Sequence, residues 1–154
     1  MKVYILAVGE QKSGPEQTLT DDYCKRFERS ARSLGFTGIN QIIVKSGGGI
    51  AKEGERLVSR LPNKAHTIRL DEHGKSISSK ALADRLSHLR DDGVRELVFL
   101  IGGAEGYSED VKAACPETMA LGPQTWPHLL VRAMISEQLY RAATIIAGNP
   151  YHKA

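Results

Sequence analysis

The sequence predicts an α/β fold with a mostly parallel sheet and helices on both of its faces. Short apolar runs alternate along the chain with longer segments whose apolar residues recur every three or four positions; these patterns are typical of buried strands and amphipathic helices, respectively. Strands that alternate with helices form parallel sheets. The chain has no repeats and no internal linker, and 154 residues are about the length of one domain. We therefore expect one domain over residues 1–154.

The first quarter of the chain contains a strand, a loop and a helix. The strand is predicted at Val3–Val8, an apolar run too short for a secretory signal or a membrane span. Turn-forming residues follow at Glu10–Pro15. The next segment ends at Gly35, and its apolar spacing predicts a helix with this core face: Leu19, Tyr23, Phe27, Ala31 and Leu34.

The charge and cysteine content give only weak indications of function. The same helix has a basic face, which we interpret as solvated rather than as an RNA contact: Lys25, Arg26, Arg29 and Arg32. The net charge is +3, from 21 Lys+Arg and 18 Asp+Glu, and only weakly indicates a nucleic-acid partner. Cys24 and Cys115 have no C-x-x-C spacing, so we expect reduced, buried thiols and no metal. No stretch approaches the length of a membrane span, so we expect a soluble cytoplasmic protein.

Two strands and two helices are predicted in the middle of the chain. They are a strand at Ile39–Val44, a helix at about Lys52–Leu61, a strand at Thr67–Asp71, and a helix capped by Ser78 or Ser79 that ends at Gly93. The glycine-rich stretch Ser46–Gly49 lacks the Lys-Ser or Lys-Thr of a P-loop. Asp71 is expected at the end of its strand, where it either contacts a ligand hydroxyl or opens the turn through Gly74.

A fourth strand leads into the most informative part of the sequence. It is predicted at Leu97–Ile101 and runs into Gly102–Gly106, where three glycines let backbone amides approach a ligand closely. A short apolar run at Thr118–Leu121 precedes a second loop, Gly122–His128, which two prolines make rigid. Open α/β sheets bind ligands at the carboxyl ends of their strands, so we expect the ligand site at this edge.

The last helix is predicted at His128–Ala147, with Gly148 as its C-terminal cap and Pro150 as its stop. Its polar residues form one narrow stripe: Arg132, Ser136, Glu137, Arg141 and Thr144. Most of the remaining circumference is apolar, which is more than packing against one sheet requires. We therefore expect a second subunit to cover this helix in a homodimer.

Several familiar catalytic motifs are missing, but four segments carry a resemblance. The sequence has no G-x-S-x-G, H-E-x-x-H or G-x-G-x-x-G motif and no spaced pair of carboxylates in a credible pocket. The four segments are LIGGAEG at 100–106, WPHLLVR at 126–132, EQLYRA at 137–142 and NPYH at 149–152. In sequence and order they resemble the ribosomal RNA large subunit methyltransferase H family of the SPOUT methyltransferases, and the resemblance covers essentially the whole chain.

The resemblance implies an S-adenosylmethionine-dependent enzyme that methylates N3 of a pseudouridine in 23S rRNA of the assembled ribosome. It also implies a C-terminal trefoil knot, which general topology rules disfavour. The implied cofactor-binding residues are Leu70 with Asp71 beside it, Gly103, and the loop residues Gly122, Pro123, Gln124, Thr125, Trp126 and Pro127. A side chain at Gly103 is expected to project toward the ligand. The chain departs from the family at Ala104 and within Gly122–Trp126, where backbone contacts are expected to survive.

Methyl transfer to a ring nitrogen requires in-line alignment and a group that accepts or stabilises the leaving proton. The candidates for this chemistry are His128, Arg132, Arg141, Tyr151 and His152. Each has a structural alternative, such as a helix cap for His128 or a docked tail for the last two. Two other functions stay open: a SPOUT enzyme that methylates another RNA such as tRNA, and a catalytically silent RNA- or ribosome-binding module.

The length of the last helix predicts how these candidates are distributed. About 20 helical residues span roughly 30 Å, whereas Gly148–His152 spans at most about 18 Å when extended. The tail therefore cannot easily return to the cofactor loop of its own chain. We expect it to lie beside the cofactor loop of the partner in an antiparallel dimer.

Overall fold

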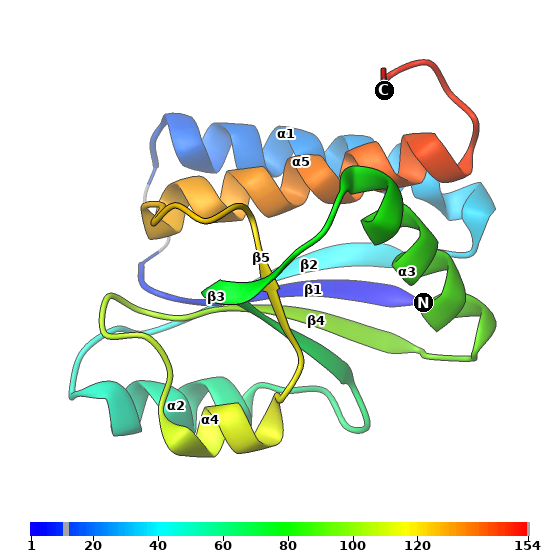
Figure 1. Cartoon of the computed structure of the whole chain (residues 1–154). Coiled ribbons are helices and arrows are strands. Elements are labelled where there is room, and N and C mark those ends of the chain that lie inside the picture. Colours follow the sequence, from blue (N-terminus) through cyan, green and yellow to red (C-terminus); the bar gives the residue numbers. More distant parts are fainter. Residues whose placement is uncertain (11–12, 154) are drawn as a thin grey trace.

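The computed structural model describes residues 1–10 and 13–153, and its centre is a five-stranded sheet (Figure 1). The strands are β1 (Lys2–Val8), β2 (Gly38–Val44), β3 (His66–Ser76), β4 (Glu96–Ile101) and β5 (Thr118–Ala120). They lie in the order β2-β1-β4-β3-β5, and every pairing is parallel. The predicted parallel sheet is confirmed. Residues 11 and 12 of the predicted loop Glu10–Pro15, and Ala154, lie outside the described residues.

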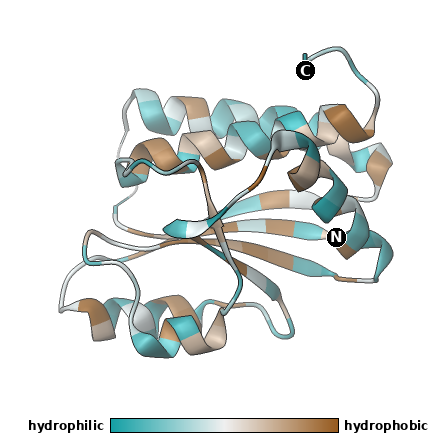
Figure 2. Cartoon of the chain, in the orientation of Figure 1, coloured by the Kyte–Doolittle hydropathy of each residue, from teal (hydrophilic) through white to brown (hydrophobic). Residues whose placement is uncertain are grey.

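Helices cover both faces of the sheet, as predicted (Figure 1). One face carries α1 (Pro15–Ala31), α3 (Ser79–Asp91) and α5 (His128–Ile146), with the short 3-10 helix η1 (Arg32–Leu34) after α1. The other face carries α2 (Ile50–Ser59) and α4 (Glu109–Ala114). Figure 2 shows hydrophobic and hydrophilic residues interspersed along these helices, as expected for elements with one face toward the sheet. The threading of a knot stays a prediction.

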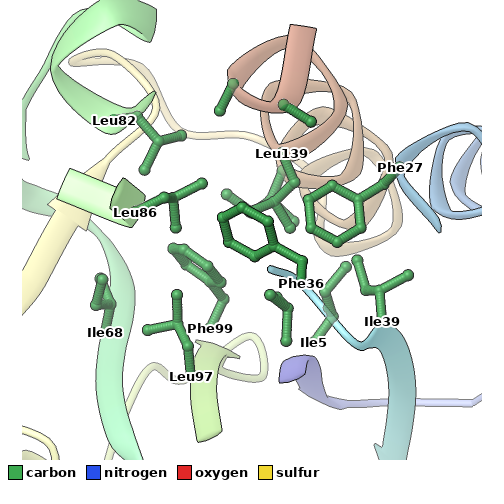
Figure 3. Packing of buried hydrophobic residues seen from close by; sticks show 14 of the residues in the cluster. Ile5, Phe27, Phe36, Ile39, Ile68, Leu82, Leu86, Leu97, Phe99 and Leu139 are labelled. Carbon is green, nitrogen blue, oxygen red and sulfur yellow. The ribbon is translucent and has the colours of Figure 1, made fainter. Parts of the chain in front are cut away.

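The core lies on both sides of the two central strands. β1 and β4 pair in register from Lys2 with Glu96 to Ala7 with Ile101, and their apolar side chains are fully or almost fully buried. On the α1 side, the rings of Phe27 and Phe36 meet edge to face at 5.6 Å between centroids (Figure 3). A second buried cluster, with Leu6, Val98 and Leu100, packs on the other face, so the sheet is held between two apolar layers.

Helix α1 buries a different face from the one predicted. Leu19, placed on the core face by its spacing, is 45% exposed, whereas Thr20 and Cys24 are buried with Phe27 and Ala31. The buried spacing of four, three and four is equally helical, but it includes a threonine and a cysteine that apolar periodicity does not single out. Cys24 fits because its thiol donates a weak hydrogen bond to the buried Ser136 hydroxyl of α5 at 3.7 Å.

Helix α5 packs against both α1 and α3, so the chain covers more of it than expected. Most of its predicted polar stripe turns inward, and three of those residues are buried: Arg132, Ser136 and Thr144. The side that the chain leaves half-buried contains Leu130, Met134 and Ile145 together with Glu137 and Arg141. The part of α5 that the chain leaves half-buried is therefore narrower than the sequence indicated, and the homodimer stays a prediction.

Strand β3 is longer than predicted. It continues through Asp71 to Ser76 and changes register against β5 between Leu70 and Lys75. Asp71 therefore lies in an irregular part of the strand rather than at its end, although its neighbour Leu70 forms the last pair with β4. Its carboxylate accepts a hydrogen bond from the His73 amide at 3.0 Å, which stabilises the irregularity.

The thiols are buried and unpaired, as expected. Burial raises the pKa of the Cys24 thiol to about 11, so it stays protonated at neutral pH. Over residues 1–10 and 13–153, no helix is long and apolar enough to span a bilayer. The same residues contain no cluster of His, Cys, Asp and Glu side chains suited to a metal ion.

Candidate active site

Loops at the carboxyl edge of the sheet surround two adjoining cavities. The chain passes from β1 to β2 on one side of the sheet, and from β4 past β3 to β5 on the other. The connections therefore diverge between β1 and β4, the kind of switch point at which open α/β sheets bind ligands. Both cavities are lined by the loop that follows β4.

The first of these, which we call the Leu70 cavity, has a volume of about 570 Å³, within the usual range for small-molecule sites. Its lining includes seven of the nine predicted cofactor-binding residues: Leu70, Asp71, Gly103, Gly122, Gln124, Thr125 and Trp126. Pro123 and Pro127 belong to the same loop but do not line the cavity. The structure thus brings together strand and loop residues that are more than 50 positions apart, although their role in binding stays a prediction.

The lining of the Leu70 cavity is acidic. It contains four carboxylates and one lysine: Asp71, Glu72, Glu105, Glu109 and Lys112. Arg69 lies 3.4 Å from Asp71, and Lys112 lies 2.8 Å from Glu109, so two of the four are paired with Arg or Lys, while Glu72 lies 3.6 Å from the exposed His73 imidazole. The remaining excess of negative charge favours a positively charged ligand.

Tyr107 joins the strand ends at this cavity. Its hydroxyl lies 2.8 Å from the carbonyls of both Leu70 and Leu100, to either of which it can donate, and it accepts from the Gly102 amide at 3.0 Å. Burial raises the pKa of Tyr107, so the hydroxyl remains a donor. The guanidinium of Arg69 lies 5.1 Å from the ring centroid. Tyr107 therefore positions the backbone of two predicted cofactor-binding segments.

Replacing Tyr107 with Phe should loosen this cavity without unfolding the protein. The change leaves the Gly102 amide without its acceptor, so we expect a loss of about 1–3 kcal/mol in the free energy of unfolding. The affinity for S-adenosylmethionine, the cofactor expected from the sequence, should fall about tenfold. Urea unfolding and calorimetric titration measure the two effects. Tyr4→Phe, which removes a hydroxyl from a residue that lines neither cavity, should leave the affinity unchanged; an equal effect of both variants would contradict the assignment.

The predicted cofactor loop is held by contacts at both of its ends. The indole Nε1 of Trp126 donates to the Leu121 carbonyl at 3.1 Å, and the Thr125 hydroxyl donates to the carboxylate of Glu72. Trp126 is half-buried and Thr125 is exposed. The loop is thus tied to the irregular part of β3, a contact that its two prolines alone do not indicate.

Gly103 differs from expectation in the direction that a side chain would take. A Cβ at this position would lie 2.8 Å from Oε1 of Glu53 and 3.3 Å from Cγ1 of Val8, and neither residue lines the Leu70 cavity. The prediction that a side chain would project toward the ligand is therefore wrong. Glycine is required here by close packing of the loop against α2 and β1.

The second cavity, which we call the Glu53 cavity, has a volume of about 510 Å³. It lies among the loops after β1, β2 and β4, and its lining includes Gly9, Gly47, Glu53 and Leu129. Four residues line this cavity and the Leu70 cavity alike: Gly103, Ala104, Glu105 and His128. The two cavities are therefore neighbours, with exposed His128 at their common boundary.

Arg132 lies one helical turn after His128 but in a different environment. Its side chain is buried, and its guanidinium donates to the carbonyls of Val8 at 3.2 Å and Glu10 at 3.3 Å. Burial lowers its pKa. Within the described residues its Nε has no hydrogen-bond partner. Arg132 holds the loop after β1, and any catalytic role stays a prediction.

The other three catalytic candidates gather around Glu137 on the second half of α5. Oε1 of Glu137 accepts from Nε of Arg141 at 2.9 Å and from the Tyr151 hydroxyl at 3.0 Å. The Tyr151 ring packs on Tyr140 with centroids 4.7 Å apart, and Nδ1 of His152 lies 3.4 Å from Arg141. Burial and Glu137 raise the pKa of Tyr151, so its hydroxyl is a donor. The tail is thus docked on the helix from which it emerges.

The candidates therefore form two groups in one chain. His128 and Arg141 are 13 residues apart on α5, which is about 20 Å along a helix. None of Arg141, Tyr151 and His152 lines either of the two cavities. Unless the tail rearranges, Arg141, Tyr151 and His152 can reach a cavity beside His128 only if that cavity belongs to a second chain.

Sequence reasoning missed two residues of this region, Glu53 and Tyr107. Glu53 lies between Ile50 and Leu57 on the apolar face of its helix, and a carboxylate on a buried face is a signal that was available. Tyr107 directly follows the glycine-rich loop, but nothing in the sequence indicates that its hydroxyl reaches back to Leu70.

Comparison with known proteins finds relatives over essentially the whole length of the sequence. A family model described as "Predicted SPOUT methyltransferase" matches residues 1–152. A protein of Hyphomonas neptunium named Ribosomal RNA large subunit methyltransferase H is 60% identical over 154 residues, which are 100% of both chains. Proteins of the same name from Caulobacter vibrioides and Ruegeria pomeroyi are 48% and 45% identical, each over 99% of both chains.

A solved structure gives a weaker match. The SpoU methyltransferase AviRb of Streptomyces viridochromogenes, in complex with AdoMet, is 16% identical and aligns with 95% of this chain and 58% of its own at a TM-score of 0.42. A score at this level supports no conclusion about fold or site. The family assignment therefore depends on the sequence relatives.

Proposed function

This chain belongs to the SPOUT methyltransferase family, within the group named ribosomal RNA large subunit methyltransferase H, and from that premise we propose that it methylates N3 of a pseudouridine in large-subunit ribosomal RNA. The methyl donor is S-adenosylmethionine, the substrate is the assembled ribosome in the cytoplasm, and residues 1–154 act as one domain. The observation that carries the proposal is the 60% identity over the full length of both chains.

The Leu70 cavity fits the proposed cofactor. When bound, S-adenosylmethionine supplies a methyl group on a positively charged sulfonium. The excess of carboxylates in the lining suits that charge, and the cavity volume suits a ligand of this size. Leu70, Gly103 and the loop 122–127 are the residues that would hold it.

Methylation at N3 requires that the ring nitrogen lose a proton. His128 lines both cavities, so its imidazole is placed to accept a proton from a substrate base that lies next to the cofactor. Histidine is the commonest general base in such steps. Arg141, Tyr151 and His152 can contribute only from a partner chain, where they would orient the base or stabilise developing negative charge.

We propose the dimer on the half-buried strip of α5. Met134 and Glu137 line a groove of about 410 Å³ between α5, α3 and the end of β5, with Leu82 and Leu121 opposite; we call it the Met134 groove. Apolar side chains that remain partly exposed along a helix favour a self-complementary contact about a two-fold axis. An antiparallel arrangement would carry each tail toward the partner's Leu70 cavity.

Met134→Glu should separate the subunits while each chain stays folded. A charge placed in an apolar interface is unpaired, so the dissociation constant should rise about 100-fold or more. Light scattering and circular dichroism measure association and fold. Ile135→Glu is the matched control, because Ile135 is fully buried within the chain and its replacement should unfold the protein instead. A wild-type monomer at micromolar concentration would contradict the dimer.

The function is tested by incubating the protein with ribosomes and radiolabelled S-adenosylmethionine. We expect label in large-subunit RNA, and mass spectrometry of the digested RNA should find the methyl group on a pseudouridine. Label in transfer RNA instead would favour the other-RNA alternative. Cofactor binding by calorimetry with no methylated RNA of any kind would favour the silent binding module.

A further inference from the structure

Glu53 is a buried carboxylate that faces the Glu53 cavity. It lies in the first turn of α2, is 9% exposed, and accepts a hydrogen bond at Oε2 from the Gly47 amide at 2.9 Å. Over residues 1–10 and 13–153 this is the only hydrogen bond of its side chain, so Oε1 accepts none from the chain. Oε1 is not among the fully buried atoms, and Glu53 lines the cavity. This oxygen is therefore available to accept a hydrogen bond from a ligand in the cavity.

The surroundings hold this carboxylate in place. Nη1 of Arg56, one turn further along α2, donates to the carbonyls of Lys45 at 2.9 Å and Gly47 at 2.6 Å. Gly54, the residue after Glu53 in the helix, packs so closely on Ser108 that an added Cβ would clash with the hydroxyl. Both the helix and the glycine-rich loop are thus fixed, and the site is preformed.

The position of the cavity suits the methyl acceptor. The Glu53 cavity and the Leu70 cavity adjoin along Gly103–Glu105 and His128. A group in the first cavity can therefore meet a methyl donor in the second across this boundary. A volume of about 510 Å³ accommodates a nucleobase with part of its sugar.

The chemistry of the lining favours a neutral base over a phosphate. Among the described residues that line the cavity there is no Lys or Arg, whereas Glu10, Glu53 and Glu105 are acidic. Phosphate contacts need cations or free amides. Val8 and Leu129 provide apolar surface for a flat ring, and a carboxylate recognises ring N–H groups, because it only accepts hydrogen bonds.

We propose that the Glu53 cavity holds the target pseudouridine and that Glu53 accepts a hydrogen bond from its ring N1–H. Pseudouridine is joined to its ribose through carbon, so N1 carries a hydrogen that uridine lacks. With N1–H on Glu53, N3 on the same ring is free to face the Leu70 cavity. This inference rests on the proposed function and adds the residue that distinguishes pseudouridine from uridine.

The inference is tested with two kinds of ribosome, one with pseudouridine and one with uridine at the target position. The quantity compared is the ratio of kcat/KM on the first to kcat/KM on the second. Wild type should favour pseudouridine, and Glu53→Ala should lower the ratio about 10- to 100-fold, because a hydrogen bond to a charged acceptor is lost for one substrate only. Glu53→Gln keeps the size and an acceptor for Gly47, and should lower the ratio about tenfold. Glu53 as a mere support for the loop would change both substrates equally and leave the ratio intact.

Glu55→Gln is the matched control. Glu55 lies two residues along the same helix, is exposed, and among the described residues pairs only with Lys52, at 3.3 Å, so its loss should not change the ratio. A ratio that survives in Glu53→Ala, or a wild type that methylates both ribosomes equally, overturns the inference while the proposed function stands. Ribosomes that are not methylated at all would overturn the proposed function itself.

A binding measurement gives a readout besides activity. Pseudouridine nucleoside added to the protein saturated with S-adenosylhomocysteine should shift the amide resonances of Gly47, Gly49 and Ala104. Uridine should shift them less, and in Glu53→Gln the two nucleosides should act alike. Shifts confined to the Met134 groove, for example at Ser79 and Gln138, would place the base elsewhere and overturn the inference.

Discussion

Gly103→Val is expected to lower the affinity for S-adenosylmethionine at least 100-fold while the fold is largely retained. The position of the new Cβ lies 2.8 Å from Glu53 and 3.3 Å from Val8, and valine adds two further methyl groups. The Glu53 carboxylate is the end of a flexible side chain and can move aside, but Val8 is anchored in the core with β1 and cannot, so the loop Gly102–Gly106 must move to make room for the γ-methyl groups. That loop lines the Leu70 cavity, and displacement of about 1 Å is enough to spoil a binding site.

The stability cost should be much smaller than the loss of binding. Overpacking at the edge of a core costs about 1–3 kcal/mol, which thermal unfolding measures, while calorimetric titration measures the affinity. Gly14→Val is the matched control, since Gly14 has extended backbone and, among the residues that the structure describes, a Cβ there would meet only Glu16, at 3.5 Å. If folded Gly103→Val bound the cofactor as wild type does, the cofactor site would have to lie elsewhere.

Deleting Pro150 to Ala154 is expected to leave cofactor affinity unchanged and to lower methyl transfer about 10²- to 10⁴-fold, the usual contribution of acid, base and orienting groups. The deletion removes Tyr151 and His152, neither of which lines the Leu70 cavity of its own chain. Cofactor binding by calorimetry and initial rates on ribosomes measure the two effects. Removing only Lys153 and Ala154 keeps the contacts of Tyr151 and His152 with α5, and should be nearly silent.

Mixed dimers decide whether the active site is shared. A dimer of one truncated chain and one Gly103→Val chain contains one site with an intact cofactor loop and an intact tail, provided that these come from different chains. Such mixtures should regain up to half the wild-type activity per dimer. With subunit exchange verified by mass spectrometry, failure of every mixture would mean that tail and cofactor loop act within one chain.

The sequence predicts the parts of the fold that depend on local pattern. Leu97–Ile101 and Val3–Val8 are uninterrupted apolar runs, and both are central strands within one residue of the expected bounds. Helix α5 ends at Ile146, one residue before the predicted end. By contrast, the polar stretch from Asp71 to Ser76 has no strand pattern, and it extends β3 only because β5 lies beside it.

The sequence predicts the parts of the site that belong to a single loop. It does not predict the parts that depend on contacts between distant segments. The Gly-rich loop and the loop 122–127 were both expected at the carboxyl edge, and they meet at the Leu70 cavity. The side-chain direction at Gly103 could not be predicted, because it depends on how α2 packs under the loop. The same holds for Glu53, whose place next to Gly103 is set by the tertiary fold.

The contacts between α5 and the start of the chain have a consequence for folding. Nη2 of Arg132 bonds the Val8 carbonyl 124 residues away, and Cys24 meets Ser136 across 112 residues. Contacts of such high sequence separation slow folding, because a long loop must close before they form. Helix α5 is synthesised last, yet it packs mainly on α1 and α3, so the apolar faces of these two helices stay uncovered until it has left the ribosome. We therefore expect this protein to reach its native state only after synthesis ends, and a chain stalled before α5 to expose these faces and aggregate.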